Sequence, residues 1–293
     1  MADAPGRRRL LFVKSRQASF IELDQRLLAE RYQLSVIYQP GRYANPLTVL
    51  RAVLRADVVV GWWASWHTFL PFTLAWLLRK PSLLIVGGFD TAAEPEFGYG
   101  FQLGGMRKHL SRFTMRRARV LMANSQYTRS EIERNCAIPA GRVSVVHHGV
   151  PDQAPAPVQK QRLAVTAGIV DTTNLERKGL RPFAQAAALL PDVEFVLAGR
   201  LADGAGQALA DGAPPNLRIT GWLEDHELQD LFARAAAYVQ PSKHEAFGVS
   251  VAEAMLARCV PVVSRAGALP EVVGEAGVIL ADTAPETVAA GIR

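Results

Sequence analysis

Short apolar runs alternate with longer amphipathic stretches along almost the whole chain. Runs of this length between turn residues are typical of buried strands, and the stretches between them have the spacing of helices that cover a sheet. In the first half, the strand candidates are Leu10–Val13, Gln33–Tyr38, Val58–Val60, Leu83–Val86, Val120–Ala123 and Val143–Val146. In the second half, they are Leu163–Ala167, Glu194–Ala198, Leu217–Thr220, Tyr238–Gln240, Pro261–Ser264 and Val278–Leu280. The pattern predicts two doubly wound α/β domains in tandem, whose ligands would lie beyond the carboxyl ends of the strands.

A segment rich in proline and polar residues, Pro151–Gln161, separates the two sets of strands. Such a composition is typical of an interdomain linker. We therefore expect one Rossmann-like domain over residues 1–155 and a second over residues 162–293. The chain stops inside a predicted helix after its last strand, so we expect the second domain to be incomplete at its C-terminus.

One apolar stretch, Val58–Leu78, contains 21 residues without a formal charge, which is long enough to span a bilayer. Gly61 and Pro71 interrupt it, which favours a strand, a loop and a buried helix. The first residues lack the apolar core of a secretory signal. The two cysteines, Cys136 and Cys259, indicate neither a disulfide framework nor a metal site. These observations predict a cytoplasmic protein.

The net charge of +6 hides an uneven distribution. Residues 1–160 carry 22 Lys and Arg against 11 Asp and Glu, whereas residues 161–293 carry 11 against 16. A chance imbalance on a solvated surface is one interpretation, and an anionic partner such as the inner face of a membrane or a phosphorylated acceptor is the other. For the second, we expect a stripe on the predicted helix Met106–Ala118, formed by Lys108, Arg112 and Arg116, with Arg119 at its end or just past it. No nucleic-acid partner is expected.

The stretch with the most chemical information is Ser242–Glu253, SKHEAFGVSVAE, which follows a predicted strand and opens a predicted helix. Glu245 then lies in the loop and Glu253 more than a turn into the helix, so the two carboxylates address different parts of one ligand. Between them, the unpaired N–H groups at the helix start, Gly248–Ser250, form a natural seat for a phosphate. Gly248 allows a ligand to approach the backbone closely.

This arrangement resembles the family 4 glycosyltransferases, whose segment E-x-F-G-x-x-x-x-E is matched by Glu245, Phe247, Gly248 and Glu253. Related features flank the motif in both halves: Glu176–Gly179, Ala198–Arg200, Gly221–Leu223, Gly267–Val273, Gly87–Asp90, Asn124–Ser125 and His148–Val150. The resemblance implies a GT-B fold, in which the N-terminal domain binds the acceptor and the C-terminal domain binds a nucleoside diphosphate sugar. It implies a retaining transfer in which the leaving diphosphate acts as the base.

The resemblance also implies roles for single residues. Glu245 would bind hydroxyls of the donor sugar, Glu253 the ribose and Lys178 the diphosphate. The other groups expected to bind the donor are Phe247, Gly248, Val249, Ser250, Arg177, Gly199 and, beside the base, the backbone of Leu223. Arg177 is expected to replace a charge that relatives carry after the first strand of this domain. No Asp-x-Asp motif is present, and a lysine with a helix start can neutralise a leaving diphosphate, so we expect neither a metal ion nor another cofactor.

Other features leave alternatives open. His67, among three tryptophans, is a candidate catalytic residue on the acceptor side, although packing in the core is the plainer interpretation. The loop with Phe97, Tyr99 and Phe101 is either part of an acceptor cleft or a mobile glycine-rich loop. The turn Lys14–Phe20 lacks the glycines that many relatives have there. A nucleotide-sugar epimerase of the same architecture, or a nucleotide-sugar-binding module without turnover, stays as an alternative function.

Overall fold

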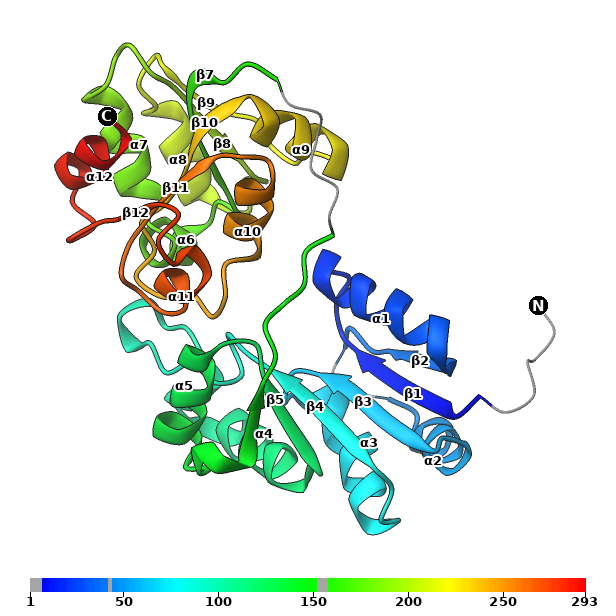
Figure 1. Cartoon of the computed structure of the whole chain (residues 1–293). Coiled ribbons are helices and arrows are strands. Elements are labelled where there is room, and N and C mark those ends of the chain that lie inside the picture. Colours follow the sequence, from blue (N-terminus) through cyan, green and yellow to red (C-terminus); the bar gives the residue numbers. More distant parts are fainter. Residues whose placement is uncertain (1–6, 42–43, 152–157) are drawn as a thin grey trace. The chain divides into compact units, whose positions relative to one another are not determined.

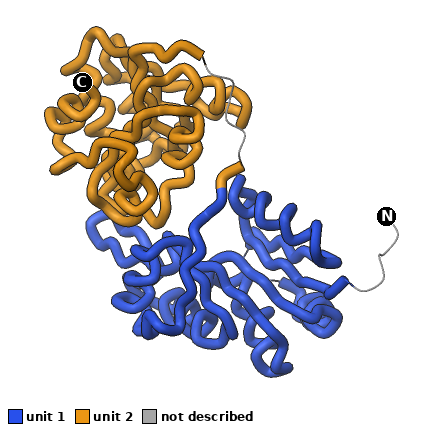
Figure 2. Tube along the Cα trace, viewed as in Figure 1, with its two compact units in different colours: residues 1–149 blue, residues 150–293 orange. Residues whose placement is uncertain are grey.

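The computed structural model describes residues 7–41, 44–151 and 158–293, and it contains two compact units (Figure 1). Unit 1 comprises Met1–Gly149 and unit 2 comprises Val150–Arg293 (Figure 2). Most of the predicted linker, residues 152–157 of Pro151–Gln161, lies outside the described residues. Each unit is built around its own six-stranded sheet.

Unit 1 contains a parallel sheet with the strand order β2-β1-β3-β4-β5-β6. Its strands are β1 (Arg9–Lys14), β2 (Gln33–Tyr38), β3 (Val58–Trp62), β4 (Ser82–Val86), β5 (Val120–Ala123) and β6 (Val143–Val145). The α-helices between them are α1 (Ser19–Arg31), α2 (Pro46–Arg55), α3 (Trp66–Leu77), α4 (Gly105–Arg117) and α5 (Gln126–Cys136).

Unit 2 contains a second parallel sheet, with the order β12-β11-β10-β7-β8-β9. Its strands are β7 (Gln161–Ala167), β8 (Glu194–Ala198), β9 (Leu217–Ile219), β10 (Ala235–Gln240), β11 (Val260–Val263) and β12 (Val278–Ile279). Its helices are α6 (Thr172–Arg177), α7 (Leu180–Ala188), α8 (Gly204–Asp211), α9 (Asp225–Arg234), α10 (Val249–Leu256), α11 (Leu269–Val273) and α12 (Pro285–Ile292).

Helices on both faces bury the central strands of each sheet, such as β1 and β10, which explains the continuous apolar runs in the sequence. In β1, Leu11 and Val13 belong to one core cluster, and Leu10 and Phe12 belong to another on the opposite face. Unit 2 has the same arrangement, with separate core clusters on the two faces of its sheet. The predicted class, two Rossmann-like doubly wound domains of the GT-B type, agrees with this architecture.

All twelve predicted strands are present, and the largest difference in a boundary is at β10, which begins at Ala235 rather than Tyr238. The apolar stretch Val58–Leu78 divides into β3, a loop and the 12-residue helix α3, as its breaks predict. No helix within the described residues is long and apolar enough to cross a membrane. The final helix, α12, packs on α7 of its own unit.

The predicted basic stripe on α4 is present but interrupted by Arg112. The helix ends at Arg117, so Arg119 lies beyond it. Arg112 is half-buried, and its guanidinium donates to Gln102 Oε1 at 2.9 Å and to the carbonyl of Asn135. Arg112 is less exposed than Arg116 and is held by these two hydrogen bonds, so the stripe is interrupted in the middle.

Candidate active site

The order of strands in unit 2 creates one place where connections leave in opposite directions. In chain order its strands are arranged 3-2-1-4-5-6, so the connection after β7 runs toward β8, and the connection after β10 runs toward β11. The carboxyl ends of β7 and β10 therefore border a crevice, which is where open α/β sheets bind ligands. Lys178 and Glu245 follow these two strands.

The carboxylate of Glu245 is held by two donors. Its Oε2 atom accepts hydrogen bonds from Gln240 Nε2 at 2.7 Å and from Lys178 Nζ at 3.4 Å. Gln240 is in turn fixed by Tyr238, whose hydroxyl donates to Gln240 Oε1 at 3.2 Å and accepts from the N–H of Ala167 at 3.3 Å. The carboxylate thus connects the ends of β7 and β10 through a continuous polar network.

Glu245 is ionised in this setting. Burial alone would raise its pKa, but the charges of Lys178, Arg177 and His244 outweigh burial and lower it. The ion pair is shielded but not closed off, since the Lys178 side chain is 20% exposed and the Glu245 side chain is 14% exposed. An ionised carboxylate with remaining lone pairs can accept hydrogen bonds from ligand hydroxyls.

Glycines allow the backbone around this pair to pack without side chains. Gly179 has φ of 68°, and a Cβ atom there would lie 2.1 Å from the carbonyl oxygen of Pro241. Gly267 has φ of 63°, and a Cβ atom there would lie 2.0 Å from the carbonyl oxygen of Glu245. Because both φ values favour glycine and both contacts exclude a side chain, the loop that carries Glu245 is fixed from two sides.

Arg177 is buried and forms hydrogen bonds to the loop that carries Glu245. Only 7% of the residue is exposed, and its guanidinium donates to the carbonyl of His244 at 3.2 Å and to Asn174 Oδ1 at 2.7 Å. Its own carbonyl accepts from the N–H of Lys243 at 2.8 Å. These contacts give Arg177 a structural role and add positive charge near Glu245, whereas direct contact with a donor stays a prediction.

Helix α10 begins where the sequence predicts, after Gly248 with φ of 100°. The first intrahelical bonds come from the N–H groups of Val251 and Ala252, which donate to the carbonyl of Gly248. In the described part of the chain, the N–H groups of Val249 and Ser250 have no acceptor, as expected for a helix start. The side chain of Ser250 hydrogen-bonds to Tyr238, which joins this helix start to the network of Glu245.

Glu253 differs from Glu245 in its environment. It is half-buried in α10, and burial, reinforced by the charge of Asp225, raises its pKa to about 7. Among the described residues, no hydrogen-bond donor or cation pairs with its carboxylate. Such a group gains stabilisation from any ligand that donates hydrogen bonds to it.

The ends of β7 and β8 are pressed together beside the site. A Cβ atom on Gly199 would lie 1.7 Å from the carbonyl oxygen of Gly168, and one on Gly168 would lie 3.2 Å from the Lys178 side chain. After β9, Trp222 is 68% exposed and Leu223 is half-buried. Phe247 is buried at 6% exposure. The predicted donor-binding residues therefore gather at one end of the unit 2 sheet.

His67, the remaining candidate catalytic residue, lies in the core of unit 1. It is 3% exposed, and its Nε2 atom hydrogen-bonds to the carbonyl of Trp62 at 2.7 Å. Burial lowers its pKa to about 4, against the opposing effect of this hydrogen bond, so the ring is neutral near pH 7. Burial and this hydrogen bond favour the packed interpretation of His67, and an acceptor-side role stays a prediction.

An aromatic cluster instead marks the switch point of unit 1, at the carboxyl ends of β1 and β3. His148 stacks on Trp62 with ring centroids 5.2 Å apart, and Phe20 lies 5.1 Å from both rings. Trp63 completes the cluster with φ of 61°, a left-handed conformation that is strained for tryptophan, and its Nε1 donates to the carbonyl of Gly87 at 3.0 Å. Sequence reasoning assigned His148 no binding role.

The glycine-rich aromatic loop is ordered by its own contacts. Phe89 packs edge to face against Tyr99 and Phe101, with centroids 4.8 and 4.9 Å apart. The N–H of Phe101 donates to the carbonyl of Phe89 at 2.8 Å, and a Cβ atom on Gly100 would lie 2.0 Å from the carbonyl oxygen of Ala92. These contacts pack the loop against neighbouring residues of unit 1, and its place in an acceptor cleft stays a prediction.

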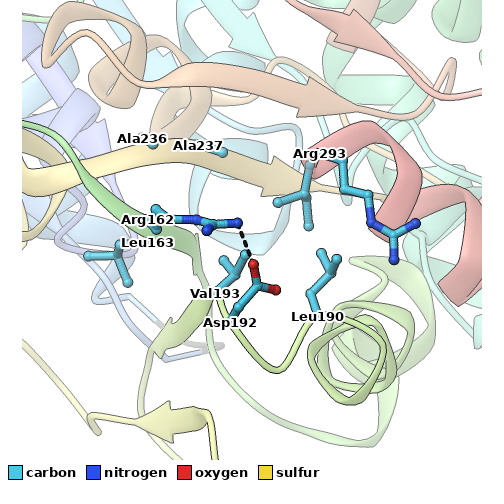
Figure 3. A pocket seen from close by; sticks show the side chains of 9 residues that line it. Arg162, Leu163, Leu190, Asp192, Val193, Ala236, Ala237 and Arg293 are labelled. Carbon is cyan, nitrogen blue, oxygen red and sulfur yellow. Dashed lines mark hydrogen bonds and ion pairs between the residues drawn. The ribbon is translucent and has the colours of Figure 1, made fainter.

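A cavity of about 420 Å³ lies at the opposite end of the unit 2 sheet, where the strands start (Figure 3). Its lining includes the first residues of β7 and β10, together with Leu190 and Arg293. Two of its lining residues, Arg162 and Asp192, form an ion pair (Figure 3). This cavity is far along the strands from Glu245 and contributes nothing to the candidate site.

Both units match known protein families. Residues 19–154 match the family model described as Glycosyltransferase Family 4, and residues 162–293 match the model described as Glycosyl transferases group 1. The structure is similar to that of HepE from Anabaena, solved with UDP and glucose, with a TM-score of 0.74 and 16% identity over 97% of this chain and 89% of that one. A likeness at this identity shows the GT-B fold alone.

Two curated relatives are similar in sequence. The O-antigen chain mannosyltransferase B of Escherichia coli is 31% identical over 180 residues, which cover 55% of this chain and 47% of the relative. The GDP-mannose-dependent alpha-(1-6)-phosphatidylinositol dimannoside mannosyltransferase of Mycobacterium tuberculosis is 32% identical over 105 residues, 35% of this chain and 27% of the relative. The matches span less than half of the length of these relatives. Together with the two family models, they place the chain in the family 4, group 1 glycosyltransferases.

Proposed function

We propose that this member of the glycosyltransferase family transfers a sugar from a nucleoside diphosphate sugar to an acceptor hydroxyl. The transfer retains the anomeric configuration and needs no metal ion. The observation that carries the proposal is the pair of Lys178 and Glu245 at the switch point of unit 2, beside the helix start at Gly248. At this end of the sheet, the ammonium group of Lys178 can bind an anion, and the carboxylate of Glu245 can accept hydrogen bonds from hydroxyls. A nucleoside diphosphate sugar contains both an anionic diphosphate and sugar hydroxyls.

In the proposed step, the bond between the anomeric carbon and the diphosphate oxygen breaks, and a bond from the acceptor oxygen to the anomeric carbon forms on the same face. The acceptor proton passes to the leaving diphosphate. Lys178 and the N–H groups of Val249 and Ser250 stabilise the negative charge that develops on the leaving group, which can replace a metal ion in that role. Glu245 orients the sugar through its hydroxyls, and Glu253 binds the ribose.

For the donor, we propose GDP-mannose as the first candidate, because both relatives similar in sequence are named as mannosyltransferases, one of them dependent on GDP-mannose. For the acceptor, the same names support a glycan or a lipid-linked sugar. The aromatic cluster of unit 1 supports binding of a sugar acceptor there, since aromatic faces pack well on the apolar faces of sugar rings.

The test is a panel of GDP-mannose, UDP-glucose and UDP-N-acetylglucosamine, each incubated with the protein and with small mannoside acceptors. Expected products are free nucleoside diphosphate and a glycoside whose anomeric configuration, read by NMR, equals that of the donor. A chelator should leave the rate unchanged. Inverted product contradicts retention, and a rate that falls with the chelator and returns with a divalent cation contradicts metal independence.

The same panel separates the alternative functions. A donor whose sugar is isomerised without transfer indicates an epimerase. Tight binding by calorimetry without any released diphosphate, across all donors and acceptors, indicates a binding module. Either outcome overturns the proposed transferase.

A further inference from the structure

The parallel sheet of unit 1 brings six separate connections to one end. Since its strands all run in the same direction (Figure 1), the residues that lead into each strand meet where the strands start, at what we call the amino end of the sheet. This end is opposite to the carboxyl ends of β1 and β3 with their aromatic cluster. The six segments are scattered over more than a hundred residues of sequence, so no local pattern reveals what they share.

Every one of these connections carries an exposed arginine. We call this set the arginine rim: Arg7, Arg8, Arg31, Arg55, Arg79, Arg116, Arg119 and Arg142. Within the described residues, the same connections contain two acidic side chains, Glu30 and Asp57, and Asp57 is already paired with Arg9 at 2.8 Å. The amino end of this sheet is therefore strongly positive.

Large apolar side chains are exposed in the middle of the rim. The last turn of α3 and its C-cap carry Trp76, Leu77 and Leu78, which are 48%, 62% and 41% exposed, directly before Arg79. The guanidinium of Arg117 lies 4.5 Å from the Trp76 ring centroid. The neighbouring connections add Leu54 at 51% and Val120 at 41% exposure. Such a group of exposed apolar side chains, bordered by cations, is typical of a surface that meets a partner.

We propose that the arginine rim, with Trp76–Leu78 at its centre, is a docking surface for an anionic lipid bilayer. Cationic side chains are attracted to the negative surface potential of such a bilayer, and tryptophan and leucine beside them can enter the interfacial region. A nucleic acid or a soluble polyanion would use the arginines but gain nothing from exposed leucines. The apolar centre therefore favours lipid.

Unit 2 provides an internal reference, because its sheet is also parallel. The residues that lead into its strands are of mixed charge: Lys160, Asp192, Arg234, Arg258 and Glu275. A one-sided basic end is thus not a consequence of the architecture. The proposal does not depend on the transferase activity, since it concerns the amino end of unit 1 and can be measured without any donor.

The test is co-sedimentation of the full chain with vesicles of phosphatidylcholine alone or mixed with phosphatidylglycerol. We expect binding to the mixed vesicles that weakens as salt shortens the range of the charge interaction. Reversing two charges, Arg79→Glu with Arg119→Glu, should lower the partition coefficient about tenfold or more, since each arginine contributes attraction at the surface. Leu77→Ser should lower it several-fold without changing the net charge.

The matched control is Arg218→Glu with Arg258→Glu, which makes the same charge change on exposed positions of unit 2 and should leave most of the binding intact. Thermal unfolding shows whether each variant is folded. Equal binding to neutral and mixed vesicles overturns the proposal, as does an equal loss in the control pair. Tight binding to soluble dextran sulfate together with vesicle binding that ignores Leu77→Ser assigns the rim to a soluble polyanion and also overturns it.

Discussion

Both sheets have six parallel strands, but they differ in the position of their first strand and in the residues that follow their strands. Unit 2 has the order 3-2-1-4-5-6 and unit 1 the order 2-1-3-4-5-6, so the switch points fall beside different strands. In unit 2 the switch point carries an ion pair and a polar network, whereas in unit 1 it carries stacked aromatic rings. The strand order creates a crevice in both units, and the side chains that follow the strands determine which ligand groups each crevice can bind.

The amino ends of the sheets differ as well. Unit 1 has arginines on all six segments that lead into its strands, while unit 2 has mixed charges and a cavity lined in part by an ion pair. The charge difference between the two halves of the chain therefore has two sources. One is the basic amino end of the sheet in unit 1, and the other is the excess of acidic residues in unit 2. The comparison predicts that variants in one unit change one property and leave the other unit's property intact.

The largest effect is expected from Glu245→Gln, which removes the charge that the sugar hydroxyls would meet in unit 2. Two charge-assisted hydrogen bonds are worth about 1.5 to 3 kcal/mol each, so kcat/KM should fall by about a hundredfold or more. Nucleoside diphosphate binding, measured by calorimetry, should stay within about twofold. Glu275→Gln, an exposed carboxylate of the same unit, serves as the control. Loss of nucleotide binding in Glu245→Gln would show that this residue binds the nucleotide.

Lys178→Met should come next, because it keeps the length of the side chain and removes its charge. A group that stabilises the leaving diphosphate acts mainly in the transition state, so we expect kcat to fall by roughly 30-fold to 100-fold and donor affinity to change much less. The pKa of Glu245 should also rise, since the charge of Lys178 lowers it. The acid limb of the pH profile of kcat/KM should then shift to higher pH. An unchanged profile contradicts the coupling of the two residues.

Glu253→Gln should affect the nucleotide and not the sugar. Loss of charge-assisted bonds to ribose should weaken nucleoside diphosphate binding by about 1.5 to 3 kcal/mol, roughly tenfold or more. In the parent, the pKa of Glu253 is about 7, and in the proposed role its ionised form would accept hydrogen bonds from the ribose hydroxyls. Nucleotide affinity should therefore increase as the pH rises through about 7, and this increase should be absent in the variant. Isothermal titrations at several pH values measure both.

Trp63→Ala tests the other side of the comparison. Removing an indole that borders the aromatic cluster should raise the KM for a soluble sugar acceptor several-fold, in line with about 1 kcal/mol for an aromatic contact. Binding of nucleoside diphosphate should be unchanged, because the residue belongs to unit 1. An equal loss for donor and acceptor would break the division of roles between the units.

The smallest effect concerns stability. A glutamate has a pKa near 4.3 in an unfolded chain, whereas Glu253 has a pKa of about 7 in the folded one. Between these values the folded protein binds more protons, so its stability falls as the pH rises through this window and stays lower above it. The variant Glu253→Gln does not lose stability in this way. At pH 8 its free energy of unfolding should be about 1 kcal/mol higher than that of the parent, after allowance for the partial exposure of Glu253. Denaturant titrations at pH 5 and pH 8 check the difference.

The sequence predicted much of this arrangement, for reasons visible in single residues. Apolar runs located the central strands because both of their faces are buried, and the glycine at position 248 located the start of α10. The order of the strands was not predicted, because crossover connections leave no local signal. Gln240 and Tyr238 were missed because they lie within a predicted core strand, and their hydrogen bonds to Glu245 and Ala167 depend on distant segments.

The basic residues show the same limit. Periodicity compares neighbours on one helix, and it assigned Arg112 to a stripe that the structure interrupts. The arginine rim contains positions from six connections that only the topology brings together. His67 was selected for its aromatic neighbours in sequence, yet the histidine that stacks on Trp62 is His148, from the end of the unit.

The contact between Gly199 and Gly168 restricts how this protein can evolve. A Cβ atom on Gly199 would lie 1.7 Å from the Gly168 carbonyl oxygen, so even alanine forces the ends of β7 and β8 apart. Natural drift or a mutagenesis library can therefore change exposed positions such as Trp222, but not the contact between Gly199 and Gly168. A saturation library at Gly199 should return almost only the parent codon, whereas one at Trp222 should return many functional alleles.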